Sequence, residues 1–288
     1  MSPNGGGSLP ERVGTLVVVG TGIAVGHLTS EARGWLEQAD KVLYCVADVA
    51  TERLIQKLNP TAESLYVFYA DDKPRSRTYQ EMIERILECV RQGVKVCVAF
   101  YGHAGIFVNP SHESIRRARL EGHRAMMLPA VSSLDCLFAD LGVDPSIGCQ
   151  IFEATDLLVR KRPIDPSGIV IIWQIGCVGD PGFRFKGYDA RNLPVLVEYL
   201  EQYYGPDYEV VIYQASQYNI CDPVIRKLKL KEVSPAVVTA ISTMYIPPKR
   251  RNPADAEMIR RLGLVKPKET PTDPAPAARL AATAQPRS

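Results

Sequence analysis

The chain has 288 residues, of which 46% are hydrophobic and 23% are charged, and its formal net charge is +2. These values are ordinary for a globular protein that is large enough for two domains, and they give no reason to expect a nucleic acid as partner. No apolar run approaches the roughly 18 residues that a membrane helix needs, so no membrane partner is expected either.

The seven cysteines are scattered along the chain and include no C-x-x-C pair. A disulfide framework and a zinc site are therefore not expected, and no other metal site is predicted. Thiols in apolar runs are typical of small core residues in a reducing compartment, so we expect a cytoplasmic protein.

Strands and helices alternate in the first half of the sequence, which predicts a parallel sheet covered by helices. Strands are expected at 15–20, 41–46, 64–68, 94–100 and 124–128, and helices at 30–39, 50–58, 78–93 and 111–120. A capping box, Thr78-x-x-Glu81, is expected to start the third of these helices. The glycines from Gly20 to Gly26 are spaced G-x-G-x-x-x-G, which does not fit a dinucleotide-binding site.

The second half is also predicted to be α/β. Helices are expected at 134–141, 192–204 and 254–262, and strands at 150–153, 169–175, 209–214 and 237–245. The predicted organisation is a flexible tail (1–13), an N-terminal α/β subdomain (14–129), a C-terminal α/β subdomain (130–247), an extension with a short helix (248–264) and a disordered Pro/Ala-rich tail (265–288).

The strand at 94–100 leads into a loop with glycines at 102 and 105, and Asn109-Pro110 then begins a helix. Glycine lets the main chain approach a ligand closely or adopt a positive φ, so this strand–loop–helix unit predicts a binding site. A tight turn between core aromatic residues is the alternative interpretation.

Three motifs in this order resemble a known family: Tyr101-Gly-His-Ala-Gly-Ile-Phe107, Leu128-Pro-Ala-Val-Ser-Ser133 and Ala139-Asp-Leu-Gly-Val-Asp-Pro145. The chain resembles the tetrapyrrole-methylase superfamily of S-adenosylmethionine enzymes from about residue 14 to 262. Within it the chain is most similar to the borosin α-N-methyltransferases, which methylate backbone amides of a ribosomally made peptide. Ala104 stands where that family usually has proline.

This resemblance implies two α/β subdomains with S-adenosylmethionine in the cleft between them. The implied cofactor contacts are Tyr101, Gly102, His103, Gly105, Ile106, Val108, Ser132, Ser133, Gln174, Tyr213, Ser242 and Thr243. A capping or turn hydroxyl is an equal alternative for Ser132, Ser133 and Ser242, as is a structural hydrogen bond for His103.

The resemblance also implies an acceptor site with the spacing Tyr-x5-Arg-x3-Tyr, which Tyr69, Arg75 and Tyr79 fit. An amide nitrogen is a poor nucleophile because its lone pair is delocalised, so the site needs a base and a group that stabilises the imidate oxygen. The hypothesis is that Tyr79 takes the amide proton, Arg75 favours the phenolate or neutralises the oxygen, and Tyr69 orients the amide. Since the sulfonium activates the methyl group, no metal is needed.

Two alternatives remain for this acceptor site. In a solvated loop, Arg75 and Arg77 would face Asp71 and Asp72, and Tyr79 would be a core residue of its helix. Arg77 could also share the role of Arg75.

The sequence after Leu264 contains five prolines and no hydrophobic run of the kind that fused members of the family methylate. We therefore expect a separate precursor peptide as substrate, with methylation of the chain's own 278–284 segment as the alternative. The resemblance implies a homodimer. A tetrapyrrole or other small-molecule methyltransferase and a non-catalytic S-adenosylmethionine-binding protein are the competing functions.

Overall fold

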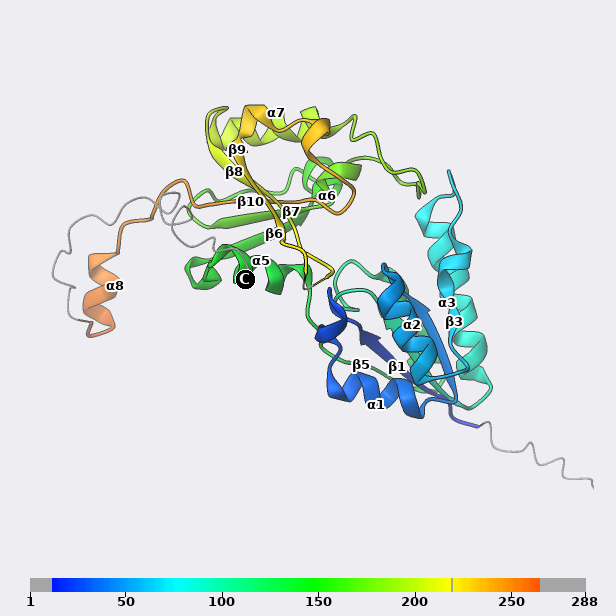
Figure 1. The fold of residues 1–288 in the computed structure, drawn as a ribbon. Coiled ribbons are helices and arrows are strands. Elements are labelled where there is room, and N and C mark those ends of the chain that lie inside the picture. The colour runs from blue at the N-terminus through cyan, green and yellow to red at the C-terminus, as the bar shows by residue number, and fades with distance from the viewer. Residues whose placement is uncertain (1–11, 219, 265–288) are drawn as a thin grey trace, which may run out of the picture. The chain divides into compact units, whose positions relative to one another are not determined.

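The computed structural model describes residues 12–218 and 220–264, and the chain divides into two compact units (Figure 1). The first unit contains Met1–Asp135, Pro181–Phe185 and Ser216–Cys221, and the second contains Cys136–Asp180, Lys186–Ala215 and Asp222–Ser288. The division falls at Asp135, later than the Pro129 suggested by the sequence. Two short segments from the second half also join the first unit, because they pack there.

The sheet of the first unit is parallel and has the order β3-β2-β4-β1-β5. Its strands are β1 (Thr15–Gly20), β2 (Lys41–Cys45), β3 (Glu63–Ser64), β4 (Lys95–Phe100) and β5 (Arg124–Met127). The central strands are continuous apolar runs, as expected for strands that are buried on both faces. The strand predicted at 64–68 was wrong beyond Ser64, because Leu65–Phe68 forms a 3₁₀ helix.

Helices cover both faces of this sheet. On one face α1 (Ser30–Gln38) and α2 (Val49–Leu58) pack against Val17, Val19 and Val42. On the other face α3 (Arg75–Arg91) and α4 (Asn109–Leu120) pack against Leu16, Val18 and Val98. Successive side chains of β1 thus point to opposite faces of the sheet and pack into two separate cores.

The sheet of the second unit is mixed, with the order β6-β7-β10-β8-β9. Its strands are β6 (Cys149–Glu153), β7 (Ile169–Trp173), β8 (Glu209–Gln214), β9 (Val224–Lys229) and β10 (Thr243–Ile246). Helices α6 (Ala154–Val159) and α7 (Leu193–Tyr204) cover one face, where Ile172, Ile212 and Met244 are fully buried. Helix α5 (Ser133–Leu141) leads into this unit, and α8 (Ala256–Arg261) follows it.

The sequence missed two elements and misplaced a third in the second unit. The edge strand β9 has no apolar run, since charged residues stand at Arg226, Lys227 and Lys229. Helix α6 is short and is capped by the Glu153 carboxylate, which accepts from the Thr155 and Asp156 amides. The strand predicted at 237–245 begins only at Thr243, since Pro235–Val237 is a 3₁₀ helix and residues 238–242 form turns or irregular structure.

Among the described residues, no helix is long and apolar enough to cross a membrane.

Candidate functional site

Helix α3 carries two of the three predicted acceptor residues, Arg75 and Tyr79. It begins at Arg75, so the capping box predicted from Thr78 was wrong. Thr78 is buried within the first turn and donates its hydroxyl to the Phe68 carbonyl at 3.4 Å. The helix begins early because the Arg75 amide finds an acceptor outside the helix, the Pro181 carbonyl, at 3.0 Å. Arg75 and Tyr79 are therefore one turn apart on one helical face.

Arg77 lies between these two residues in sequence but faces another way. Its guanidinium is 3.5 Å from the Glu81 carboxylate, and its side chain is 76% exposed. The structure thus distinguishes the two arginines, with Arg77 in solvent and Arg75 half-buried.

Tyr69 follows the 3₁₀ helix Leu65–Phe68 and packs, like Tyr79, against the core of the first unit. Burial raises the pKa of Tyr69 well above the ordinary phenol value, and the nearby Cys45 and Tyr79 raise this pKa further. Arg75 lowers the same pKa, so its guanidinium is close enough to act on the Tyr69 hydroxyl. Tyr69 and Tyr79 thus pack against the same core, Arg75 lies one turn before Tyr79, and burial keeps Tyr69 a neutral phenol at physiological pH.

The solvated-loop alternative expected Arg75 and Arg77 to face Asp71 and Asp72, and these ion pairs were wrong. Asp72 pairs with Arg184, and the Asp71 carboxylate accepts from the Phe185 amide at 2.8 Å. Both aspartates thus bond to the segment Pro181–Phe185, and no sequence pattern predicts that this segment lies beside them.

The loop of residues 101–108 follows β4 at the carboxyl end of the first sheet. The Tyr101 amide donates to the Cys45 carbonyl at 3.1 Å, and Gly102 exchanges two main-chain hydrogen bonds with Gly22. Gly102 has φ +67°, a conformation that suits glycine. Since Cys45 also influences the pKa of Tyr69, the loop and the acceptor residues lie at the same end of the sheet.

His103 and Ser132 have the structural roles that were considered as alternatives for them. The Gly105 amide donates to His103 Nδ1 at 2.9 Å. Ser132 precedes α5, accepts from the Leu134 amide at 3.2 Å and donates to Asp135 at 2.7 Å, while Ser133 begins the helix. The cofactor contacts predicted for Tyr101, Ile106 and Val108 stay predictions, and all three side chains are partly exposed.

Four predicted residues lie at one end of the second sheet. Gln174 follows β7 with φ +60°, and Thr243 begins β10 opposite Tyr213. Ser242 accepts from Gln214 Nε2 and from the Thr239 amide, both at 2.8 Å, which gives it the turn role considered above. Tyr213 is fully buried and donates to Asp140 at 2.7 Å. Their assignment to the cofactor stays a prediction.

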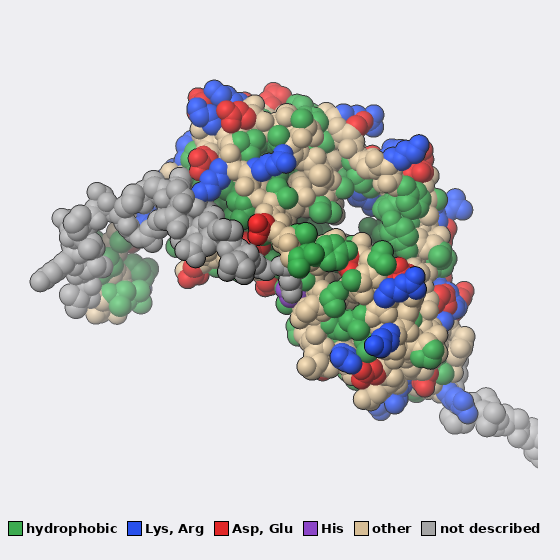
Figure 2. All heavy atoms as spheres, viewed as in Figure 1, with side chains coloured by type: hydrophobic (Ala, Val, Ile, Leu, Met, Phe, Trp, Pro, Cys, Tyr) green, Lys and Arg blue, Asp and Glu red, His purple; other side chains and the backbone are tan. Residues whose placement is uncertain are grey.

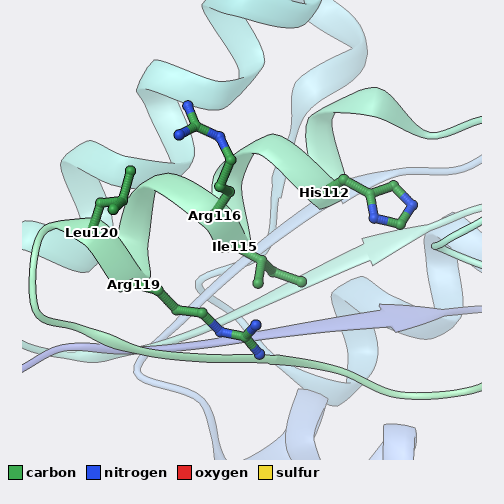
Figure 3. Close-up of a pocket in the computed structure, with 5 residues that line it drawn as sticks. All are labelled: His112, Ile115, Arg116, Arg119 and Leu120. Carbon is green, nitrogen blue, oxygen red and sulfur yellow. The ribbon is translucent and has the colours of Figure 1, made fainter.

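A hollow of about 420 Å³ lies on α4, lined by His112, Ile115, Arg116, Arg119 and Leu120 (Figure 3). None of the predicted site residues lines it. His112 nevertheless lies 2.8 Å, through Nε2, from the Gly105 carbonyl, so this helix helps to fix the 101–108 loop. The sequence did not single out His112, because one histidine near a helix start carries no distinctive signal.

Residues 15–218 match the family of Tetrapyrrole (Corrin/Porphyrin) Methylases. The chain belongs to this family. The fold of this chain is confirmed by two solved structures with a TM-score of 0.57 each. Uroporphyrin-III-C-methyltransferase from Thermus thermophilus is 16% identical, with 82% of this chain and 92% of that chain covered. Cobalt precorrin-4 methyltransferase is 17% identical, with 81% and 94% covered.

Relatives of higher sequence identity are each named as a methyltransferase and a peptide precursor together. The dendrothelin A precursor of Dendrothele bispora is 46% identical over 88% of this chain and 63% of its own length. The omphalotin A precursor of Omphalotus olearius is 44% identical over 92% of this chain and 65% of its own. A type III borosin cyclic peptide precursor of Anomoporia bombycina is 47% identical over 88% of this chain and 30% of its own. The chain thus spans less than two thirds of the length of these relatives.

Proposed function

We propose that this chain is an S-adenosylmethionine-dependent methyltransferase that methylates backbone amide nitrogens of a ribosomally synthesised precursor peptide. One observation carries the proposal: Tyr69 and Tyr79 pack against the same core, with Arg75 one turn before Tyr79 on α3. The relatives at 44% and 46% identity, each named as a methyltransferase and peptide precursor, support the same substrate class. The solved structures of tetrapyrrole-modifying enzymes are only 16% and 17% identical to this chain. They support the fold alone and give no reason to propose a macrocyclic substrate.

The 101–108 loop fits S-adenosylmethionine by the chemistry of its groups. Tyr101, His103, Ile106 and Val108 are all partly exposed, so aromatic, imidazole and aliphatic surfaces lie beside the main-chain groups of the glycine loop. Such a mixture suits a ligand with a flat apolar base and a polar amino-acid end. When bound, the cofactor supplies an electrophilic methyl group.

The three acceptor residues divide the work on the amide. Tyr79, one turn from the Arg75 guanidinium, takes the amide proton, because an adjacent permanent cation favours its phenolate form. The electron pair of the broken N–H bond stays on the amide, which becomes an imidate with negative charge shared between nitrogen and oxygen. Tyr69, held neutral by burial, donates a hydrogen bond to the imidate oxygen, and Arg75 balances its charge. With S-adenosylmethionine bound, the nitrogen would form its new bond to the methyl carbon as the carbon–sulfur bond breaks, and the sulfur would keep that electron pair as a neutral thioether.

Whether the substrate is a separate peptide or part of the same chain decides how the enzyme works. We propose that the substrate is a peptide other than residues 265–288, since the five prolines of that segment carry no amide N–H to methylate. This segment lies outside the described residues. The relatives, in contrast, are each named as methyltransferase and precursor together.

The test uses the part of the omphalotin A precursor that this chain does not match. That part is supplied either as a separate peptide or fused to the C-terminus of this chain, and each sample is incubated with S-adenosylmethionine. Tandem mass spectrometry then locates every added methyl group. Backbone N-methylation of the separate peptide supports the proposal, methylation of the fused form alone supports a single-chain system, and methylation of neither contradicts both.

A homodimer is the proposed assembly, because a partner subunit can complete a peptide groove. Analytical ultracentrifugation at micromolar concentration tests it, and finding only monomer would contradict it.

A further inference from the structure

The segment Pro181–Phe185 pairs with residues 71–75, directly before and at the start of α3. The Arg75 amide donates to the Pro181 carbonyl at 3.0 Å, and Phe183 exchanges main-chain hydrogen bonds with Asp72 and Lys73, at 3.3 Å each. An antiparallel bridge joins Pro74 to Gly182. The ion pair of Arg184 with Asp72 adds a side-chain link. This short ladder therefore fixes the first residue of the helix that carries Arg75 and Tyr79.

The ring of Phe183 lies at the centre of an aromatic cluster that also contains Tyr66, Tyr69 and Phe185. Its centroid is 4.3 Å from that of Tyr69, with an interplanar angle of 33°. It also meets Tyr66 edge-on at 6.0 Å and Phe185 at 5.0 Å. Hydrophobic side chains gather at the end of α3 that carries Arg75 (Figure 2). Tyr69 therefore cannot turn its ring without displacing Phe183, and the ladder fixes the main chain of Phe183.

We propose that Phe183 is a positioning residue of the methyl-transfer site, which holds the Tyr69 ring in place while the ladder of Pro181–Phe185 holds Arg75. The inference rests on the proposed function and deepens it. It assigns a role to a segment that is far from the acceptor residues in sequence. The rate of methyl transfer depends on how firmly the reacting groups are held. A displacement of these groups by about 1 Å can lower a reaction rate by roughly 100-fold.

Two matched changes in the same segment separate positioning from general packing. Phe183→Leu removes the ring that lies over Tyr69, whereas Phe185→Leu removes a neighbouring ring that is 52% exposed. Phe183→Tyr keeps an aromatic ring at the central position and serves as the rescue. Phe183→Met replaces Phe183→Leu if the leucine variant does not fold.

The readouts are the single-turnover rate of methylation of the fused omphalotin A probe and the affinity for S-adenosylmethionine by calorimetry. Phe183→Leu is expected to lower the rate roughly 10- to 100-fold with the cofactor affinity unchanged. Phe183→Tyr is expected to restore most of the rate, and Phe185→Leu to retain it. An unchanged rate in a folded Phe183→Leu variant, or an equal loss in Phe185→Leu, overturns the role of Phe183 and leaves the proposed function standing. A wild-type chain that methylates no form of the probe overturns both.

Discussion

Arg75 and Tyr79 lie one turn apart on the same face of α3, and Arg77 between them turns away to Glu81. This arrangement depends on where the helix begins. Had it begun at Thr78, as its capping pattern suggests, Arg75 would lie in the preceding loop with no fixed relation to Tyr79. The hydrogen bond from the Arg75 amide to Pro181 extends the helix by one turn and so builds the site.

The two arginines provide a matched pair of variants. Arg75→Ala is expected to lower the methylation rate roughly 100-fold or more, because it removes a cationic donor from the developing imidate oxygen. Arg77→Ala is expected to retain the rate, because it removes only an exposed ion pair, and such pairs contribute little to stability. Single-turnover mass spectrometry on the fused probe measures both. Equal losses in the two variants would contradict the assignment of Arg75.

Gly102 is expected to be required for the fold of its loop as well as for the cofactor. Gly102→Val should destabilise the protein and abolish S-adenosylmethionine binding, since φ of +67° costs a side-chain-bearing residue about 1–2 kcal/mol or more. Gly26→Ala is the control, because a Cβ there meets nothing within 4 Å. Thermal unfolding and calorimetry measure the two effects. A Gly102→Val variant of wild-type stability that still binds the cofactor would contradict this prediction.

The stability of the first unit is expected to fall at alkaline pH. Burial raises the pKa of Cys97, which is fully buried in β4, to about 12 from the ordinary thiol value of 9.0. Between these two values the unfolded chain loses the thiol proton and the folded chain keeps it, so the free energy of unfolding decreases as pH rises. The decrease from this one group is on the order of 4 kcal/mol across the interval.

The test compares denaturant unfolding of wild type and Cys97→Ala from pH 8 to about pH 11, a range set by the thiol titration. The variant is less stable at neutral pH because it leaves a cavity, and the difference between the two proteins is expected to shrink as pH rises. A constant difference over the whole range would show that the thiol does not titrate in this way.

Much of the first unit could be predicted because its strands are continuous apolar runs and its helices are strongly amphipathic. The β1 and β4 strands and the four helices were found within a few residues, apart from the start of α3. The acceptor residues were predicted from a family resemblance and its Tyr-x5-Arg-x3-Tyr spacing, and their role stays a prediction. Their neighbours could not be found in this way, because Phe183 reaches Tyr69 through a pairing of segments more than a hundred residues apart in sequence, which no local pattern encodes. Edge strand β9 was missed for a local reason. Its exposed positions are charged, so the sequence of this strand contains no apolar run, although it pairs with β8 along its whole length.

The proposed role of Tyr79 as the base can be tested by the methylation rate of Tyr79→Phe, since this change removes only the hydroxyl that is proposed to take the amide proton. The rate of the fused probe is expected to fall roughly 10²- to 10⁴-fold, as for loss of a general base, while the calorimetric affinity for S-adenosylmethionine stays unchanged. Single-turnover mass spectrometry on the folded variant gives the answer. Backbone methylation by Tyr79→Phe at close to the wild-type rate would contradict the account, and the proton would then have to leave by another route.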